Sequence, residues 1–364
     1  MKFEITKEKI VNLISLISRI PSKHSNLPIL ECVFFELKNN SLTLRATNLE
    51  IGLEINVLVR GSGDGSVAVY GNIINSFFQN LQGDKNILFE SVNNSLAVSC
   101  GDISVNLKTL PADDFPTIPE AAGGEVKISA KYLHKGLKTV LFSASLSGLR
   151  PDLSSVYVYS EGENLIFAAT DSFRLAEKKI KNKTKEKIGF LLPIKNAIEM
   201  VRLLEGETGE VVMSVHKNQI SIKTPNMFVT SRLVEGNFPD YGQIIPKEYS
   251  SEALILKDDL AQALKLANIF SDSFNQVTFL FTPAKKNLEV TTRGGQYGGV
   301  NSVIRGQFKG ESLEMNYNHR YASECLSSIE SDSVSILLAG AHKPTVIRGS
   351  GDPSFTYLVM PLNK

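Results

Sequence analysis

Three segments of the chain alternate apolar and polar residues with the period of two that is typical of β-strands. They begin at Val33 (VFFELKNNSLTLRATN), Val156 (VYVYSEGENLIFAATD) and Phe279 (FLFTPAKKNLEVTTRG), and a short polar turn interrupts each of them. Each segment therefore predicts a β-hairpin. The first begins 123 residues before the second (156 − 33) and the second 123 residues before the third (279 − 156), which indicates an internal repeat.

The same offset recurs inside the second strand of each hairpin, at Leu42, Leu165 and Leu288. Between the first two units it also relates four further pairs of identical residues: Leu81 and Leu204, Gly83 and Gly206, Leu110 and Leu233, Phe115 and Phe238. A shared offset across several predicted elements favours a repeat over the general similarity of alternating strands.

Each unit opens with apolar residues at the i, i+3, i+4, i+7 spacing of one helix face. These residues are Ile10, Leu13, Ile14 and Ile17, then Leu133, Leu137, Val140 and Leu141, then Leu260, Ala263, Leu264 and Ala267. A second helix is predicted in the middle of each unit, at residues 73–81, 194–204 and 320–329, with Gly83 and Gly206 as stop signals.

Clusters of Pro, Gly and Asp separate the units, beginning at Pro111 (PADDFPTIPEAAGG) and at Gly236 (GNFPDYGQIIPKEYSS). The predicted fold class is α+β, with three repeated domains at residues 1–122, 123–250 and 251–364. Each domain is expected to carry two helices on an antiparallel sheet.

Charge and composition place the chain among ordinary globular proteins. Its 39 basic and 38 acidic side chains give a net charge of +1, so DNA contact would require local placement of charge. The basic run KKIKNKTKEK from Lys178 predicts a solvated loop, with a secondary DNA contact as the alternative. The charged N-terminus and the absence of a long apolar run predict a cytoplasmic protein.

No pattern of catalytic or metal-binding residues stands out. The three cysteines are far apart, the five histidines lack metal-ligand spacing, and no GxSxG or GxxxxGK[ST] motif occurs, so no metal or cofactor is predicted. Asp171 and Arg174 could form an active-site pair, but an ion pair or capping carboxylate in a tight hairpin turn is the favoured interpretation. An enzyme on a repeated α+β scaffold and an open-ended binding scaffold both remain alternative hypotheses.

Seven stretches in order along the chain carry a family resemblance: MKF at the start, LPIL from Leu27, ATNLEIGLE from Ala46, TLPADDFPTIP from Thr109, AATDSFRLA from Ala168, LVEGNFPDYGQIIP from Leu233 and YLVMPL from Tyr357. Over its whole length the chain resembles the β subunit of bacterial DNA polymerase III, the sliding clamp. The resemblance implies a non-catalytic processivity factor. It further implies a head-to-tail homodimer of six domains that forms a ring around duplex DNA.

The resemblance also implies where DNA is held, through phosphates and without base recognition. The matching residues are Lys23, His24, Lys131, Lys135, Lys138 and Arg150. Further basic residues on the opening helices, Lys7, Lys9, Arg19, His134, Lys257 and Lys265, would add positive charge. His24 stands where the family often has arginine.

A second implied site is a groove on the second and third domains. It would bind short linear motifs of the replicative polymerase, the clamp loader and repair proteins. Its matching residues are Leu153, Thr170, Ser172, Phe173, Arg174, Leu175, Pro239, Gln243, Ile244, Asn318, Tyr321, Leu358, Val359, Met360, Pro361 and Leu362. Gln243 and the Asn363-Lys364 ending depart from the family pattern, which affects the polar side of the groove.

The ring interface implied by the family joins an edge of the first domain to an edge of the third. Val105 and Leu107 match one side, and Ile269 and Phe270 match the other. Exposed apolar edges are unfavourable in a monomer and are explained if they pair.

Overall fold

The computed structural model describes residues 1–21, 26–83, 86–183, 186–271, 274–292 and 298–362. The chain divides into two compact units. The first unit comprises Met1–Lys131 and Ile198–Leu233, and the second comprises Tyr132–Ala197 and Val234–Lys364. Each unit is built on one long antiparallel sheet.

The first unit's sheet has 13 strands among the described residues. In spatial order they are β10 (Gly124–Ser129), β15 (Glu210–His216), β16 (Gln219–Lys223), β17 (Met227–Arg232), β4 (Ile51–Leu58), β3 (Ser41–Thr47), β2 (Cys32–Lys38), β6 (Gly65–Tyr70), β9 (Ile103–Leu110), β8 (Ser95–Cys100), β7 (Ile87–Val92), β1 (Lys2–Ile5) and β5 (Arg60–Ser62).

The second unit's sheet has 12 strands within the described ranges. In spatial order they are β14 (Gly189–Pro193), β11 (Ser155–Glu161), β12 (Asn164–Thr170), β13 (Arg174–Lys181), β25 (Phe355–Val359), β24 (Thr345–Gly349), β23 (Ser333–Leu338), β18 (Ser251–Leu256), β21 (Asn301–Gly310), β20 (Asn287–Thr291), β19 (Gln276–Thr282) and β22 (Leu313–Asn318).

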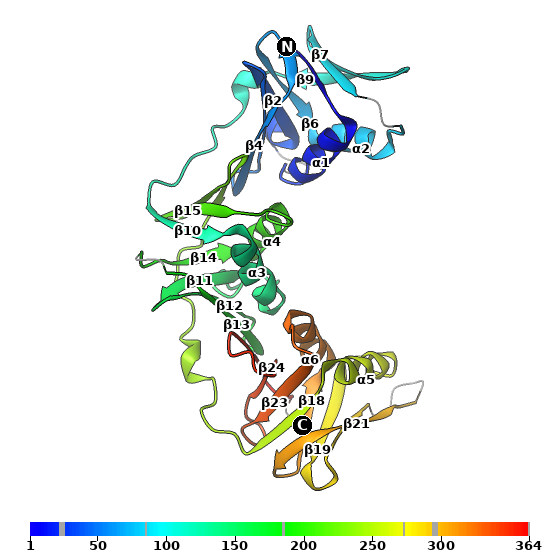
Figure 1. Ribbon diagram of the computed structural model, residues 1–364, viewed down its shortest axis with the longest axis vertical. Helices are drawn as coiled ribbons and strands as arrows, with labels where there is room; N and C mark the ends of the chain where they lie inside the picture. The colour runs from blue at the N-terminus through cyan, green and yellow to red at the C-terminus, as the bar shows by residue number, and fades with distance from the viewer. Residues whose placement is uncertain (22–25, 84–85, 184–185, 272–273, 293–297, 363–364) are drawn as a thin grey trace. The chain divides into compact units, whose positions relative to one another are not determined.

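The helices lie where the apolar spacing predicts them. They are α1 (Lys7–Ile17), α2 (Gly71–Asn80), α3 (Ala130–Val140), α4 (Ile194–Leu203), α5 (Lys257–Ile269) and α6 (His319–Glu324), the last continued by the 3₁₀ turn η6 (Cys325–Ser328). Their apolar faces are buried, as Ile10, Ile14 and Ile17 show for α1. Helices α1 and α2 pack against each other, as do α5 and α6 (Figure 1).

The internal repeat is visible in the packing. All three predicted hairpins form, as β2–β3, β11–β12 and β19–β20, and their equivalent leucines 42, 165 and 288 are completely buried. The rings of Phe34 and Phe115 lie 5.0 Å apart, and those of Tyr157 and Phe238, 123 residues later, lie 5.1 Å apart. Residues that are 123 positions apart in the sequence therefore form equivalent contacts in the two repeats.

Strand pairing continues across the predicted domain boundaries. β4 pairs with β17, and β13 pairs with β25, so each long sheet combines strands from two predicted domains. These pairings join residues far apart in the sequence, for example Leu53 with Val229. The exact boundaries at residues 122 and 250 stay a prediction.

The predicted loop at Lys178 is wrong for its first four residues, which belong to β13. Lys178 is 4% exposed, and its Nζ donates to Ser354 Oγ (2.6 Å) and lies 3.4 Å from Asp352 Oδ2. Burial of a charged amine is tolerated when it is paired and hydrogen-bonded. Because both partners come from more than 170 residues later, the local sequence gave no sign of them.

The three cysteines, Cys32, Cys100 and Cys325, are buried and free. Burial raises the pKa of the Cys32 thiol to about 12, which keeps it protonated and unreactive. Within the described residues, no helix combines the length and apolar character needed to cross a membrane.

Candidate functional site

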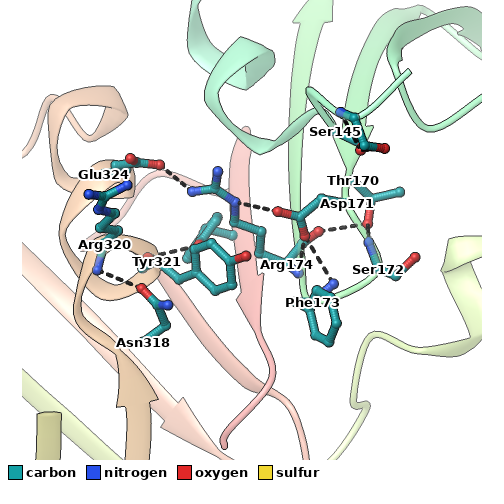
Figure 2. Close-up of polar contacts among 12 residues, drawn as sticks. Ser145, Thr170, Asp171, Ser172, Phe173, Arg174, Asn318, Arg320, Tyr321 and Glu324 are labelled. Atoms are coloured by element: carbon teal, nitrogen blue, oxygen red, sulfur yellow. Dashed lines mark hydrogen bonds and ion pairs between the residues drawn. The ribbon is translucent and has the colours of Figure 1, made fainter. Parts of the chain in front are cut away.

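The turn between β12 and β13 is held by side chains that accept backbone hydrogen bonds. Asp171 Oδ1 accepts from the backbone N–H groups of Phe173 (3.0 Å) and Arg174 (3.1 Å). Thr170 Oγ1 accepts from Ser172 N (3.2 Å) and donates to Arg174 O (2.6 Å). Ser172 has a φ of 78°, so the turn is tight and its geometry is fixed (Figure 2). The predicted capping carboxylate is confirmed.

Arg174 is the centre of this site (Figure 2). Its side chain is 10% exposed, its Nε donates to Asp171 Oδ2 (3.0 Å), and its Nη1 forms an ion pair with Glu324 of α6. The guanidinium also lies over the Tyr321 ring, 4.4 Å from its centroid. Burial opposes the charge of Arg174, but Glu324 and Asp171 outweigh it and raise the pKa of the guanidinium. The turn and α6 are thereby joined through one permanently charged group.

An apolar cluster lies beneath the turn. Leu175 and Leu358 are register partners on β13 and β25, and both are buried together with Tyr241. Met360 is partly buried against this cluster, and its backbone N–H donates to Phe173 O (2.8 Å). Met360 therefore packs against the surface of this cluster.

The expected groove residues therefore differ in their exposure. Leu153, Thr170, Leu175, Leu358 and Val359 are buried, with Leu175, Leu358 and Val359 at 1% exposure or less. Phe173 is 60% exposed and Ile244 48%, and Ser172, Pro239 and Gln243 are also exposed. Arg174, Asn318, Tyr321, Met360, Pro361 and Leu362 are intermediate. Buried members support the site from below, and the exposed and intermediate ones can touch a ligand.

The polar rim is ordered by local contacts. Asn318 Oδ1 accepts from Arg320 N (2.9 Å) and caps α6, which carries Tyr321. Gln243 Nε2 donates to Asp240 Oδ2 (2.6 Å). Leu362 N donates to Asn316 O (2.7 Å), which fixes the chain end beside β22. Asn363 and Lys364 lie outside the described residues.

The expected DNA contacts fall on α3 and on the segment after it. Lys131 and Lys138 are exposed, and with Lys135 they follow the i, i+4, i+7 spacing of one helix face. Lys135 Nζ lies 2.7 Å from Glu330 Oε1, and this contact lowers the pKa of that carboxyl. Arg150 is exposed and pairs with Asp152 (2.5 Å). Lys23 and His24 lie outside the described residues.

Two strands change partners part-way along their length. Among the described residues, Ile103–Lys108 of β9 pair with β8 alone, and only Thr109 and Leu110 pair with β6. Likewise Asn301–Arg305 of β21 pair with β20, and 306–310 pair with β18. Each partner change leaves one edge of a strand segment open.

Of the expected interface residues, Val105 and Leu107 lie on β9, whereas Ile269 and Phe270 lie at the end of α5. Leu107 is 5% exposed and belongs to the core, and Val105 is half-buried. Ile269 at the end of α5 is 64% exposed, and Phe270 after it is intermediate. Sequence reasoning missed Ile103 and Val303, which are 47% and 54% exposed on the two open strand segments. The sequence signal for them is an apolar residue at a strand position where the alternation predicts a polar, solvent-facing one.

No metal centre is formed by the described residues, since no three His, Cys, Asp or Glu side chains come together there. The imidazole of His319 is buried, with Nε2 2.9 Å from Leu264 O, and burial lowers its pKa. Its position is that of a structural histidine.

Comparison with known proteins gives one consistent family. Models of the N-terminal, central and C-terminal domains of the DNA polymerase III beta subunit match residues 1–119, 127–240 and 242–363. The beta sliding clamp of Synechococcus elongatus is 25% identical over 371 residues, covering 100% of this chain and 99% of the relative. That of Staphylococcus epidermidis is 24% identical over 373 residues, with the same coverage.

Solved structures share the fold. The DNA polymerase III beta subunit of Thermotoga maritima has a TM-score of 0.93 at 24% identity, covering 100% of this chain and 99% of its own. A sliding clamp of Pseudomonas aeruginosa bound to griselimycin has a TM-score of 0.94 at 24% identity, with both chains fully covered.

The turn at Asp171 can be tested by two substitutions. Asp171→Ala should lower the free energy of unfolding by about 1–3 kcal/mol, because two backbone N–H donors of the turn and the largely buried guanidinium of Arg174 lose a charged acceptor. Asp171→Asn should cost clearly less, since Asn48 accepts the same two backbone bonds in the equivalent turn of the first unit. Urea unfolding followed by circular dichroism measures both, and equal losses for the two variants would contradict this account.

Proposed function

Because the chain belongs to the DNA polymerase III β-subunit family, we propose that it is a DNA polymerase processivity factor, a sliding clamp that encircles duplex DNA and tethers the replicative polymerase. The observation that carries this function is the ordered match of all three domains of one subunit along residues 1–363. The β subunit is non-catalytic, which decides against the alternative of an enzyme on a repeated scaffold. No cofactor is needed for this function.

The hold on DNA is topological first and electrostatic second. Lys131, Lys135 and Lys138 on one face of α3, with Arg150, attract phosphates without reading bases. The total charge of only +1 suits a clamp that must slide. Cytoplasmic location follows from this role.

The ring is a head-to-tail homodimer in this proposal. The open segment of β9 in one chain meets the open segment of β21 in the partner, so that two unsatisfied strand edges pair. Ile103 and Val303 on these segments, and Ile269 at the end of α5, are exposed and would be buried by the contact. A hollow of about 410 Å³ between α5 and β21, which includes Leu266 and Val303, would receive apolar side chains of the partner.

The groove around Arg174 binds short linear motifs of the polymerase, the clamp loader and repair proteins. Phe173, Ile244 and Met360 offer apolar contact area, and Met adapts to varied anchors. Arg174 and the rim residue Asn318 supply fixed polar groups. Gln243 cannot contribute a positive charge, and Arg174 is already paired with Asp171 and Glu324, so acidic positions of the motif gain little at this rim.

Retention on DNA tests the clamp directly. Protein loaded onto nicked circular DNA by its clamp loader should stay bound, and cutting the circle once should release it from the open ends. Gel filtration of the DNA before and after cutting measures the bound fraction, with unloaded protein as the control. Undiminished retention on the linear product would rule out sliding.

The dimer interface predicts the effect of a single charge. Ile269→Asp should lower the solution mass from twice the 40.0 kDa chain mass to once that value, because an aspartate would be buried without a partner. Light scattering measures the mass. Leu146→Asp, at a position that is 84% exposed, is the matched control and should leave the dimer intact. Open-ended assembly of the unmodified protein would instead support a polymeric scaffold.

The groove predicts a loss of peptide binding without loss of fold. Met360→Ala should weaken a labelled peptide from the polymerase's clamp-binding segment about tenfold or more, since an apolar anchor loses its contact. Leu175 is unsuitable for this test because its side chain is in the core. Fluorescence anisotropy measures the affinity, with Leu146→Ala as control. If Met360→Ala bound the peptide as tightly as the unmodified protein, Met360 would not be part of the binding site.

A further inference from the structure

The turn at Arg174 has a counterpart in the first unit. Thr47 Oγ1 donates to Ile51 O (3.0 Å), and Asn48 Oδ1 accepts from Glu50 N (3.0 Å) and Ile51 N (2.9 Å). Leu49 has a φ of 71°, close to the 78° of Ser172, which lies 123 residues later. The two repeats thus form the same contacts, and side chains at equivalent positions can be compared.

In the second repeat, Tyr241 fills the space next to this turn. Its side chain is buried against Leu175, and its ring meets that of Phe238 edge-on, 6.0 Å between centroids. Its hydroxyl donates to Glu177 Oε2 (2.7 Å) and lies 2.8 Å from the Tyr159 hydroxyl. The second repeat therefore shows which chemical group fits this place in the fold: a phenol.

The first repeat has smaller side chains at the two central positions. Ile118 stands 123 residues before Tyr241, and Gly52 stands 123 residues before Leu175. Ile118 packs down onto Gly52, since a Cβ added to that glycine would lie 2.9 Å from Ile118 Cγ2. Ile118 is smaller than the tyrosine at its equivalent position, although Arg45 stands where the second repeat has Ala168.

A hollow of about 250 Å³ is present there. Its lining includes Phe34, Phe115, Ile118 and Glu54, the equivalents of Tyr157, Phe238, Tyr241 and Glu177, together with Arg45 and Pro116. An apolar cavity of about 150 Å³ is large enough for benzene. The hollow therefore has room for a phenol ring.

The charges of the hollow favour a hydrogen-bond donor. Arg45 pairs with both Glu54 (2.7 Å) and Glu36 (3.3 Å), so these three groups carry one net negative charge. The guanidinium also lies 5.3 Å from the centroid of the Phe34 ring. Each carboxylate oxygen can accept more than one hydrogen bond, which leaves Glu54 able to receive a hydroxyl. An anionic ligand would be repelled.

We propose that this hollow binds a phenol ring, presented as a tyrosine side chain by another protein. A protein segment is favoured over a free phenol because a second hollow, of about 310 Å³, adjoins the first at Thr117. It is lined by hydrogen-bonding side chains, among them Gln219 and Asn218, and by the exposed Leu49. Residues that flank the tyrosine would lie in it. This site is separate from the groove around Arg174.

The test uses the full-length protein labelled at isoleucine δ1-methyl groups. Three probes are added at millimolar concentration: p-cresol, toluene and the tripeptide acetyl-Gly-Tyr-Gly-amide. The Ile118 methyl signal should shift saturably with p-cresol, and toluene should bind about fivefold more weakly because it lacks the hydroxyl. The tripeptide should shift Ile118 at lower concentration than p-cresol and should also shift Ile51, which lines the second hollow.

Two variants locate the binding. Ile118→Tyr places the chain's own ring in the hollow, and saturation transfer to p-cresol should be lost while the melting temperature is kept or raised. If that variant does not fold, Glu54→Gln decides, since it should reduce the preference for p-cresol over toluene. An unshifted Ile118 signal, equal binding of toluene, or a tripeptide weaker than p-cresol would overturn the proposal.

Discussion

The pairing of β13 with β25 is the interaction on which the candidate groove depends. It sets Arg174 opposite Val359 and Leu175 opposite Leu358, and so attaches the last strand of the chain to the middle of the sequence. Without this register, Met360 would not reach Phe173, and the cluster around Tyr241 would have no Leu358. The groove is thus a consequence of sheet continuity between two repeats.

The charged side chains of β13 within its pairing with β25 have hydrogen-bond or ion-pair partners. Arg174 forms ion pairs with Asp171 and Glu324. Lys178, four residues further along β13, contacts Asp352 and Ser354. Glu177 between them accepts from Tyr241. The attraction within a buried ion pair is largely offset by the cost of removing its charges from water, so such a pair adds little net stability. These contacts join residues that are distant in the sequence, from Tyr241 with Glu177 to Lys178 with Ser354.

Much of the fold could be predicted because its signals are local. Alternation at Val33, Val156 and Phe279 gave the hairpins, and helical spacing gave α1, α3 and α5. The pairings of β4 with β17 and of β13 with β25 could not be predicted, because period-two patterns do not say which strand lies next to which. The same limit explains Lys178, whose sequence neighbours suggest a loop. It also explains Leu175 and Leu358, which the family resemblance placed in the groove wall and which the structure buries beneath it.

The internal repeat places the same turn backbone in two different side-chain surroundings. Hydrogen bonds from Thr47 and Asn48, and from Thr170 and Asp171, hold the same turn, so the backbone can be kept while the side chains that face outward change. Where the second repeat has Leu175 and Tyr241, these side chains form a buried cluster beneath the candidate groove. Where the first repeat has Gly52 and Ile118, a solvent-accessible hollow lies beside the turn. In the proposal made above, a tyrosine ring of a partner would occupy this hollow, and its binding to the folded protein would stabilise it.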